Sequence, residues 1–430
     1  MKNKNVSLIL LMTICISIYA NAQIKPEIIT YEPFVWKSKV PSDCPFSQSN
    51  NLTGIRFLGI KSGFHYGDTW YPSWGTDGNL YSPYTDGTTN GVLSISSGFS
   101  NPGIVNEQGN PTRKATTAQA VIYGDDPTSL KVEVIGVTQA DPYPYGGRYP
   151  CGSLVYNGVW YYGTYCLSPY GTTQYGDMQY NWPFLGPLVG FRYSTDLGKT
   201  WTETPHQPHK AIFKETGIGG HPVKIGSPHF VDFGKNMEYS PDGKAYLVAH
   251  GSDMTGGDNE FYHNSWITGD QIYLIRVTPS IENINDMSKY EFYAGKDEKG
   301  YPVWTNDFKI IKPLLEWKAN MGCVTITYNA ALKKYLMCVT DGENTCAKMH
   351  TYILESDKLD GDWKLVTYMK DFGEQAYFVN IPSKFISDDG KTAWLLYSGN
   401  YATNWNGMKI IENPPGSHYG LVMQKIEFIK

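Results

Sequence analysis

The chain has 430 residues, of which 41% are hydrophobic, 14% aromatic and 18% charged, and its formal net charge is −5. The aromatic content excludes a disordered chain, and an acidic balance without a basic tract argues against a nucleic-acid binder. A mean hydropathy of −0.37, with one long apolar run at the N-terminus, argues against a membrane-spanning protein. The 44 glycines and 26 prolines favour a protein built from strands and turns.

Residues 1–22 have the three parts of a secretory signal peptide. Two lysines precede an apolar run over 6–19, and Ala-Asn-Ala at 20–22 forms a small-x-small cleavage site. The apolar run is too short to span a bilayer. We therefore expect export to the periplasm or the medium, no membrane anchor, and a mature β-propeller catalytic domain over 23–430.

Export would allow the cysteines to form disulfides. Cys151 and Cys166 bracket one hairpin-like run, and Cys323 and Cys338 bracket another at the same spacing of 15. The pattern is consistent with cross-strand disulfides and equally with buried thiols, because a bridge needs a Cα separation that sequence does not give. No pair has the CxxC spacing typical of a structural zinc site.

Strand–turn–strand units punctuated by glycine and aspartate run along the mature chain, without sustained helical periodicity. Val-Tyr-Asn at 155–157 and Thr-Tyr-Asn at 327–329 occupy equivalent places in the two cysteine-bracketed hairpins, 172 residues apart. Ser-Pro-Asp-Gly-Lys at 240–244 is echoed by Asp-Asp-Gly-Lys at 388–391, and an apolar strand follows each. Repeats of 40–60 residues made of short strands are typical of β-propellers.

We therefore predict an all-β fold, a single-domain β-propeller. Dividing the 408 mature residues by seven gives about 58 per blade, so that the offset of 172 equals three blades. Seven blades are the prediction, and five or six longer blades are the alternative. The segment 194–201 also matches the SxDxGxTW Asp-box hairpin of sialidase-like propellers, which marks the fold and carries no catalytic role.

Two histidines suggest a site. His229 opens one apolar run and His250 closes the next, with the Ser-Pro-Asp-Gly turn between them. Paired residues of an antiparallel hairpin have a constant sum, and 229 + 250 = 479 centres the turn at 239–240. We expect the two rings to face each other at one rim of the propeller, with Cβ atoms about 5 Å apart. Structural histidines are the alternative.

Aromatic and polar residues gather over 64–81, and such residues stack on sugar faces and bond to sugar hydroxyls. Blade cores also use Trp and Tyr, which is the structural alternative. Arginine, which could bind an anionic ligand, is rare, with five in the chain. Arg148 lies in a glycine-rich loop and is the best placed of the five. The candidate binding residues are Arg148, Lys224, His65, Trp70, Trp74 and Trp266.

The stretches at 67–87, 227–251 and 368–391 resemble a family of exported, propeller-shaped carbohydrate enzymes. This family includes the rhamnose–glucuronate lyases that act on gum arabic, and it is similar to the propeller ulvan lyases and the ulvan-oligosaccharide dehydratases. The resemblance implies proton transfer by two histidines about twenty residues apart, which His229 and His250 match. It also implies a catalytic tyrosine, for which Tyr328 is the candidate, and a substrate-binding arginine, for which Arg276 is the candidate.

A uronate lyase removes the C5 proton beside a carboxylate and expels the group on O4, which requires an acid and a base near neutral pH. We therefore expect a carbon–oxygen lyase or non-reducing-end dehydratase that produces an unsaturated uronate. The expected substrate is an anionic oligo- or polysaccharide of the ulvan or gum-arabic type, with glucuronate or iduronate linked to rhamnose, bound by a monomer. No cofactor is assigned with certainty, and a calcium or zinc ion is the one candidate.

Two other classes of protein remain open. A sialidase- or arabinanase-like glycoside hydrolase would use a pair of carboxylates, and Asp68, Asp77, Asp232 and Glu238 are the candidates. A non-catalytic glycan-binding propeller would use the aromatic residues alone. The products distinguish the three classes, because elimination gives an ultraviolet-absorbing uronate, hydrolysis gives reducing ends without that absorbance, and binding gives neither.

Overall fold

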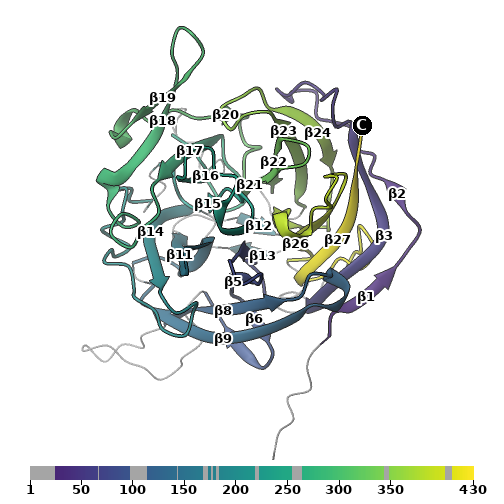
Figure 1. The fold of residues 1–430 in the computed structure, drawn as a ribbon, viewed down its shortest axis with the longest axis horizontal. Coiled ribbons are helices and arrows are strands. Elements are labelled where there is room, and N and C mark those ends of the chain that lie inside the picture. The colour runs from purple at the N-terminus through teal and green to yellow at the C-terminus, as the bar shows by residue number, and fades with distance from the viewer. Residues whose placement is uncertain are drawn as a thin grey trace, which may run out of the picture.

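The chain folds into a ring of five antiparallel sheets, or blades, around a central axis (Figure 1). The computed structural model describes residues 25–65, 67–96, 114–142, 144–167, 173–175, 178–180, 184–217, 222–253, 264–342, 348–401 and 409–430. The predicted all-β propeller is confirmed, but it has five blades where the sequence predicted seven.

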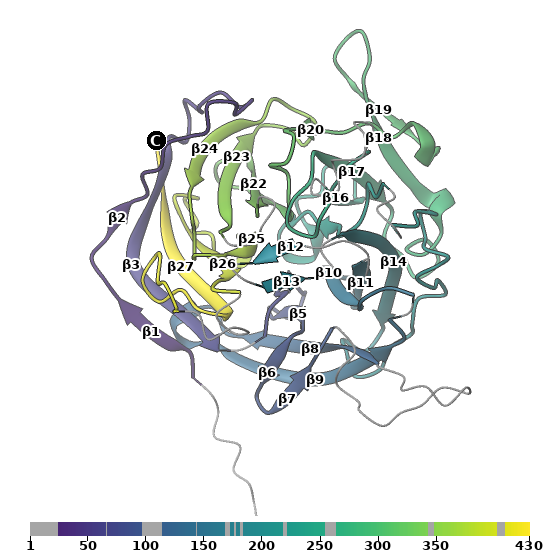
Figure 2. The same ribbon diagram turned by 180° about the vertical axis from the view of Figure 1, so that it is seen from behind.

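The first two blades each carry an inserted hairpin. Blade I contains β4 (Ser73–Trp74), β5 (Leu80–Tyr84), β8 (Ala115–Tyr123) and β9 (Lys131–Ala140), with the hairpin of β6 (Gly87–Thr89) and β7 (Val92–Ser94) after β5. Blade II contains β10 (Tyr149–Tyr156), β11 (Val159–Leu167) and β14 (Leu185–Ser194). The hairpin of β12 (Thr173–Tyr175) and β13 (Met178–Tyr180) follows β11 and lies near the axis of the ring in both views (Figures 1 and 2).

The remaining blades follow in chain order. Blade III contains β15 (His229–Phe230), β16 (Ala245–Gly251), β17 (Gln271–Val277), β18 (Tyr290–Lys296) and β19 (Pro302–Thr305), and β20 (Leu315–Glu316) pairs with β17. Blade IV contains β21 (Val324–Asn329), β22 (Lys334–Asp341), β23 (His350–Ser356) and β24 (Lys364–Met369). Short 3₁₀ turns lie between strands: η1 (Pro127–Ser129), η3 (Lys235–Met237), η5 (Met287–Lys289), η6 (Phe308–Ile310) and η7 (Ser383–Phe385).

Blade V closes the ring by joining the two ends of the chain. It contains β25 (Tyr377–Asn380), β26 (Thr392–Ser398), β27 (Gly420–Ile429) and β3 (Gly54–His65), and β1 (Glu27–Thr30) and β2 (Phe34–Val35) pair with β3. The C-terminal strand β27 runs antiparallel to β3, from the pair Gly420–His65 to the pair Ile429–Gly54 (Figure 2). This pairing joins the N-terminal and C-terminal strands within one blade and so closes the ring.

Long blades explain why the blade number predicted from the repeats is too high. The echoed motifs at 155–157 and 327–329 lie at the ends of β10 and β21, which belong to blades II and IV, so their offset covers two blades. The motifs at 240–244 and 388–391 both lie between the first and second strands of their blades, III and V. Five blades over 408 residues average about 82 residues, because the inserted hairpins and the additional strands of blade III lengthen the repeat.

The Asp-box folds as its sequence predicts. Asp196 Oδ1 accepts from the backbone N–H of Thr200 at 2.8 Å, and the N–H of Gly198 donates to Ser194 Oγ at 2.7 Å. The ring of Trp201 packs edge-on against Trp160, with centroids 5.0 Å apart. This aromatic cluster also includes side chains of blade I, so the motif fastens blades I and II together.

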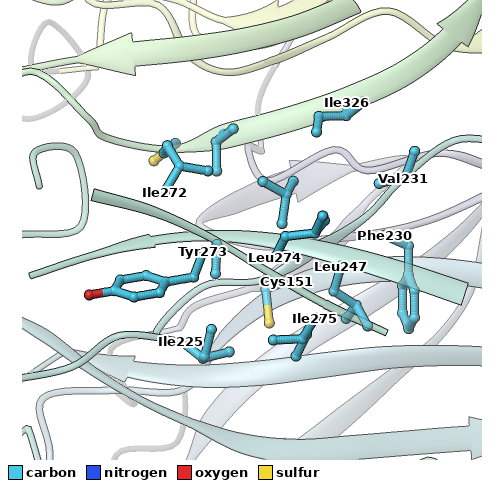
Figure 3. Close-up of a cluster of buried hydrophobic side chains, with 14 of the residues drawn as sticks. Cys151, Ile225, Phe230, Val231, Leu247, Ile272, Tyr273, Leu274, Ile275 and Ile326 are labelled. Atoms are coloured by element: carbon cyan, nitrogen blue, oxygen red, sulfur yellow. The ribbon is translucent and has the colours of Figure 1, made fainter. Parts of the chain in front are cut away.

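The core fills the space between blades. Because each sheet packs against neighbours on both faces, β16 and most of β17 are buried along their whole length. Leu247 of β16 and Ile275 of β17 pair across the sheet and lie near Cys151 and Phe230 in the cluster of Figure 3. The described cysteines are all free thiols, so neither predicted cysteine pair forms a disulfide.

The predicted leader lies outside the described residues, and its cleavage and the export of the chain remain predictions. In the part of the chain that the structure describes, no helix combines the length and the hydropathy needed to cross a bilayer.

Replacing Lys384 with Met should destabilise the ring. Its buried ammonium donates to the carbonyl oxygens of Gly78 at 2.6 Å and Gly124 at 2.7 Å, so it ties blade V to two loops of blade I. Met leaves both carbonyls without this charged donor, and we expect the free energy of unfolding to fall by about 2–3 kcal/mol. Denaturant unfolding measures the change. Lys391→Met, which removes an exposed ion pair with Asp389, is the control and should cost less than about 1 kcal/mol; equal losses would contradict the clamp.

Candidate functional site

A pocket opens where the innermost strands begin. The first strands of neighbouring blades contact one another around the axis, and Tyr149 and Tyr377 are the first residues of β10 and β25. The pocket is lined by Asp68, Thr69, Asp86, Ser96, Tyr149, Tyr165, Leu167, Trp266, Tyr377, Phe378 and Tyr401. We call it the Asp68–Asp86 pocket. Its lining combines two carboxyl groups with six aromatic rings, which is a composition that suits a sugar.

Asp68 is buried at the wall of this pocket, and its side chain is 4% exposed. Its Oδ2 accepts hydrogen bonds from the hydroxyls of Tyr377 at 2.5 Å and Tyr419 at 3.0 Å, while its Oδ1 has no hydrogen-bond partner among the described residues. Burial raises the pKa of Asp68 well above its ordinary value, and the nearby charge of Asp86 raises it further. Both effects favour the protonated form of Asp68.

Asp86 is the second carboxyl group of the pocket. The backbone N–H of Ser96 donates to its Oδ1 at 2.8 Å, and the Ser96 hydroxyl donates to its Oδ2 at 2.6 Å. Burial raises the pKa of Asp86, and the two hydrogen bonds from Ser96 oppose this rise. Because the rise is larger for Asp68, Asp86 ionises first, and the pair divides into one acid and one carboxylate.

Strained backbone marks the same pocket. Thr69, Asp86 and Phe378 have φ values of 60°, 51° and 54°, in the left-handed region that non-glycine residues rarely occupy. Phe378 is a bulky residue there, and the register of β25 against β26 shifts between Tyr377 and Asn380. Such conformations cost on the order of 1–3 kcal/mol each and cluster at functional sites, where they direct particular side chains.

The predicted histidines lie deeper, along the central channel. His229 lines a second pocket between the five innermost strands, and its Nδ1 accepts from the backbone N–H of Gly152 at 3.2 Å. His250 is fully buried, and its Nε2 donates to the carbonyl of Ser265 at 2.9 Å. Burial lowers the pKa of His229 to about 3 and that of His250 to about 4. Both imidazoles are therefore neutral at pH 7.

The predicted cross-strand pairing of the two histidines is wrong. His229 pairs with Val248, so the paired sum is 477 instead of 479. Strand β15 has only two residues, and His250 lies beyond its end, where it pairs with Ile272 of β17. The turn between β15 and β16 contains η3 and the left-handed residues Asn236 and Met237, which moves the register away from a simple hairpin.

Among the predicted binding residues, Trp266 lines the Asp68–Asp86 pocket. Trp70 is buried and stacks on Tyr84 with centroids 4.8 Å apart, whereas Trp74 is half-buried on β4. His65 lies at the end of β3, where its ring stacks on that of His418 at 4.1 Å. The structure does not bring these last three side chains into the pocket lining.

The predicted cations also lie elsewhere. Arg148 is buried, and its guanidinium donates to Thr164 Oγ1. Lys224 is half-buried, and its backbone N–H donates to the buried carboxyl of Glu215, whose pKa burial raises to about 7. Arg276 lies on β17, where it forms ion pairs with Asp242 and Glu291 and covers the ring of Trp304 at 4.0 Å.

Tyr328 lies at the far end of β21 from the Asp68–Asp86 pocket. Its ring packs against Tyr335 and Tyr239, with centroids 4.9 Å and 5.9 Å apart. Asp232, which neighbours it through a backbone hydrogen bond, accepts from the backbone and the hydroxyl of Ser383, both at 2.7 Å. These contacts fasten strands at the opposite end of the channel.

One side-chain cluster contains residue types that bind calcium or zinc. Within the described segments, Glu27, His65 and His418 form the one group of three potential ligands whose atoms lie within 4.8 Å of one another. The two rings stack with 19° between their planes, and because each lone pair lies in its ring plane, they do not converge on one ion. Lys61 Nζ also lies 2.6 Å from Glu27 Oε2. This cluster does not fit a divalent metal as it is arranged.

Several pocket residues were missed in the sequence. Asp86 was not among the candidate carboxylates, although it precedes a glycine in a turn and lies in the same stretch as Asp68. Their proximity comes from the antiparallel bridge between Asp68 and Thr85. The tyrosines around the two carboxyl groups come from blades II and V, so their convergence depends on the closed ring. They are Tyr149, Tyr165, Tyr377, Tyr401 and Tyr419.

No protein-family model matches the chain, and no curated protein matches it. Solved structures do resemble it. A putative hydrolase from Bacteroides ovatus is 12% identical, with a TM-score of 0.45, over 91% of this chain and 96% of that one. The α-L-arabinofuranosidase PaAbf62A from Podospora anserina is 11% identical, with a TM-score of 0.41, over 91% and 96%. Zg3597, a family 117 glycoside hydrolase from Zobellia galactanivorans, is 12% identical, with a TM-score of 0.40, over 94% and 90%. At this level the likeness extends to the ring architecture alone.

The prediction of a carbon–oxygen lyase is contradicted. The similar solved structures are described as hydrolases, not as lyases. Within this chain, the two histidines on which elimination depended do not pair across one hairpin, and burial lowers their pKa values to about 3 and 4. The Asp68–Asp86 pocket instead brings two carboxyl groups together.

Proposed function

We propose that the protein is a glycoside hydrolase whose active site is the Asp68–Asp86 pocket. The observation that carries the proposal is the pair of buried carboxyl groups in one aromatic-lined pocket, one of which has an oxygen without a hydrogen-bond partner among the described residues. Glycoside hydrolases use two carboxyl groups, one as an acid and one as a base or nucleophile. The glycoside hydrolase was the sequence's alternative, with Asp68 among its candidate carboxylates.

The surroundings assign the two roles. Burial and the charge of Asp86 raise the pKa of Asp68 and so favour its protonated form, which makes it the general acid. The N–H and O–H of Ser96 both donate to Asp86 and stabilise its charge, so Asp86 is the carboxylate that faces the reacting carbon or its water. Environments that separate two carboxyl pKa values in this way are typical of acid–base pairs.

The reaction balances with these two groups and one water. Asp68 gives its proton to the glycosidic oxygen as the bond from that oxygen to the anomeric carbon breaks, and the bonding electron pair stays on the leaving oxygen. The charge of Asp86 stabilises the positive charge that develops on the anomeric carbon. Water adds its oxygen to that carbon, and its protons restore Asp68 and complete the new hydroxyl.

The aromatic rings supply the carbohydrate surface. Trp266 packs at an angle against Tyr401, with centroids 5.2 Å apart, and edge-on against Tyr377 at 5.4 Å. Such rings bury the apolar face of a sugar, while the carboxyls and phenols bond to its hydroxyls. An enzyme exported by the predicted leader would meet poly- and oligosaccharides outside the cytoplasm, and we include uronate-containing sugars among the substrates to be tested.

A product assay tests the function. The purified mature chain is incubated with neutral and uronate-containing oligosaccharides, and reducing ends, product masses and ultraviolet absorbance are recorded. We expect new reducing ends and product masses that sum to the substrate plus one water, without absorbance of a conjugated uronate. Absorbance without water uptake would contradict hydrolysis, and tight binding with no product would favour a glycan-binding propeller.

A further inference from the structure

Two phenols meet on one oxygen of Asp68. Tyr377 is the first residue of β25, and Tyr419 directly precedes β27, so the two hydroxyls reach the carboxyl from two strands of blade V. Both contact Oδ2, at 2.5 Å and 3.0 Å, and neither contacts Oδ1. Oδ1 is the oxygen without a partner among the described residues. One side of the carboxyl is thus held by the protein, and the other is left for a ligand.

We propose that Tyr377 and Tyr419 are positioning residues that stabilise the carboxylate of Asp68 once it has given its proton to the substrate. The proposal rests on the proposed function, in which Asp68 is the general acid. When the proton leaves, the negative charge spreads over both oxygens, and Oδ2 already lies against two O–H groups. Hydrogen bonds to a charged acceptor are about twice as strong as neutral ones, so both contacts strengthen as the charge forms.

The need for such donors follows from the surroundings of Asp68. The carboxyl is buried, and the carboxylate of Asp86 lies near it, so a second negative charge is costly. Among the described residues, the other titratable groups that face Asp68 are phenols, which bring no positive charge: Tyr71, Tyr149, Tyr165, Tyr377 and Tyr419. Among these described groups, Tyr377 and Tyr419 are the two whose hydroxyls reach the carboxyl.

The backbone of β25 is built to aim Tyr377. Phe378 adopts a φ of 54°, and the strand register shifts between Tyr377 and Asn380. A bulge of this kind turns one side chain out of the regular alternation. Here it lets the ring of Tyr377 reach Asp68 while the ring of Phe378 packs between Trp266 and Tyr71. The strained backbone at Phe378 therefore positions the phenol of Tyr377.

The two phenols are not equivalent. The hydroxyl of Tyr419 also lies 2.8 Å from the backbone carbonyl of Asp86, so its single hydrogen has two acceptors. The hydroxyl of Tyr377 donates to Oδ2 of Asp68 at the shorter distance of 2.5 Å. We therefore expect Tyr377 to contribute more than Tyr419 to the stability of the carboxylate.

Two readouts on Tyr377→Phe and Tyr419→Phe test the proposal. The first is the pH profile of kcat/KM, whose alkaline limb marks loss of the acid's proton. We expect this limb to move to higher pH in Tyr377→Phe, with kcat/KM lower by about 10- to 100-fold and KM nearly unchanged. The second needs no substrate: in protein carrying ¹³C-labelled aspartate, the Asp68 carboxyl resonance, assigned by its loss in Asp68→Asn, should titrate about one to two pKa units higher. Tyr419→Phe should shift both readouts less.

Tyr397→Phe is the matched control. Tyr397 is a buried phenol of the same blade, and its hydroxyl contacts Ser417 at 2.7 Å instead of Asp68. This variant should lose stability without moving either the limb or the resonance. If Tyr377→Phe hydrolyses the substrate and neither the alkaline limb nor the Asp68 resonance shifts, the role of the two tyrosines is overturned, while the proposed function stands. A shifted resonance in a protein that hydrolyses none of the substrates would overturn the proposed function while leaving the contact between Tyr377 and Asp68 supported.

Discussion

Asp68→Asn is expected to lower kcat by about 10²- to 10⁴-fold, the usual contribution of a general acid. Asn has nearly the shape of Asp and keeps an oxygen for the two tyrosine hydroxyls, but it has no proton to give to a glycosidic oxygen. Asp86→Asn should lower kcat by a similar factor, because it removes the charge that faces the anomeric carbon. Initial rates of reducing-end release, measured on the substrate found in the product assay, give both factors.

A measurement of stability distinguishes this loss of activity from a loss of the folded state. Asp68 is a buried carboxyl whose pKa is raised, so the folded state carries a cost for its charge that neutral Asn does not carry. We therefore expect Asp68→Asn to unfold at the same or a higher denaturant concentration than the wild type at pH 8. Asp77→Asn is the control, since Asp77 is exposed and lies in a turn beside Tyr81, outside the pocket. Comparable rate losses in Asp77→Asn, or full activity in Asp68→Asn, would remove Asp68 from the mechanism.

The sequence carried the fold class because local rules determine it. Alternating strands, glycine–aspartate turns and the Asp-box each describe one hairpin, and the hairpins at 151–166, 194–201 and 323–338 form as expected. The blade number depended on the repeat length, which inserted hairpins such as β6–β7 and β12–β13 change without altering the blade itself. The number of blades is thus a property of ring closure between β3 and β27, and no local motif encodes it.

The site was less accessible to the sequence for the same reason. Asp68 could be named from its surroundings of Trp and Tyr, but its partner Asp86 and the phenols of Tyr377 and Tyr419 come from turns and strands that only the closed ring brings together. The histidine pair shows the opposite error. The prediction assumed a regular hairpin, which placed His229 opposite His250. In the structure β15 pairs with β16 over only two residues, and His229 lies opposite Val248.

Acid should destabilise the protein steeply because of these same histidines. The pKa values of His229 and His250 in the folded protein are about 3 and 4, both below the ordinary value of 6.5. As pH falls below 6.5, the unfolded chain binds protons at both rings and the folded chain does not, so stability present above pH 6.5 is lost. At pH 5 each ring accounts for about 2 kcal/mol, or about 4 kcal/mol together, and the loss continues until the pH reaches the folded pKa values.

Replacing both rings with Gln should flatten this dependence. The Gln side-chain oxygen at 229 can still accept from the N–H of Gly152, and the Gln amide at 250 can still donate to the carbonyl of Ser265, which are the contacts that the imidazoles make. We expect the double variant to be less stable than the wild type at pH 7 through poorer packing, yet to lose about 4 kcal/mol less between pH 7 and pH 5. Denaturant unfolding at half-unit steps of pH gives both slopes, and His209→Gln removes an exposed histidine as the control. If the double variant and the wild type lost stability in parallel, the buried rings would have to take up protons without unfolding, and water would have to reach the channel between the inner strands.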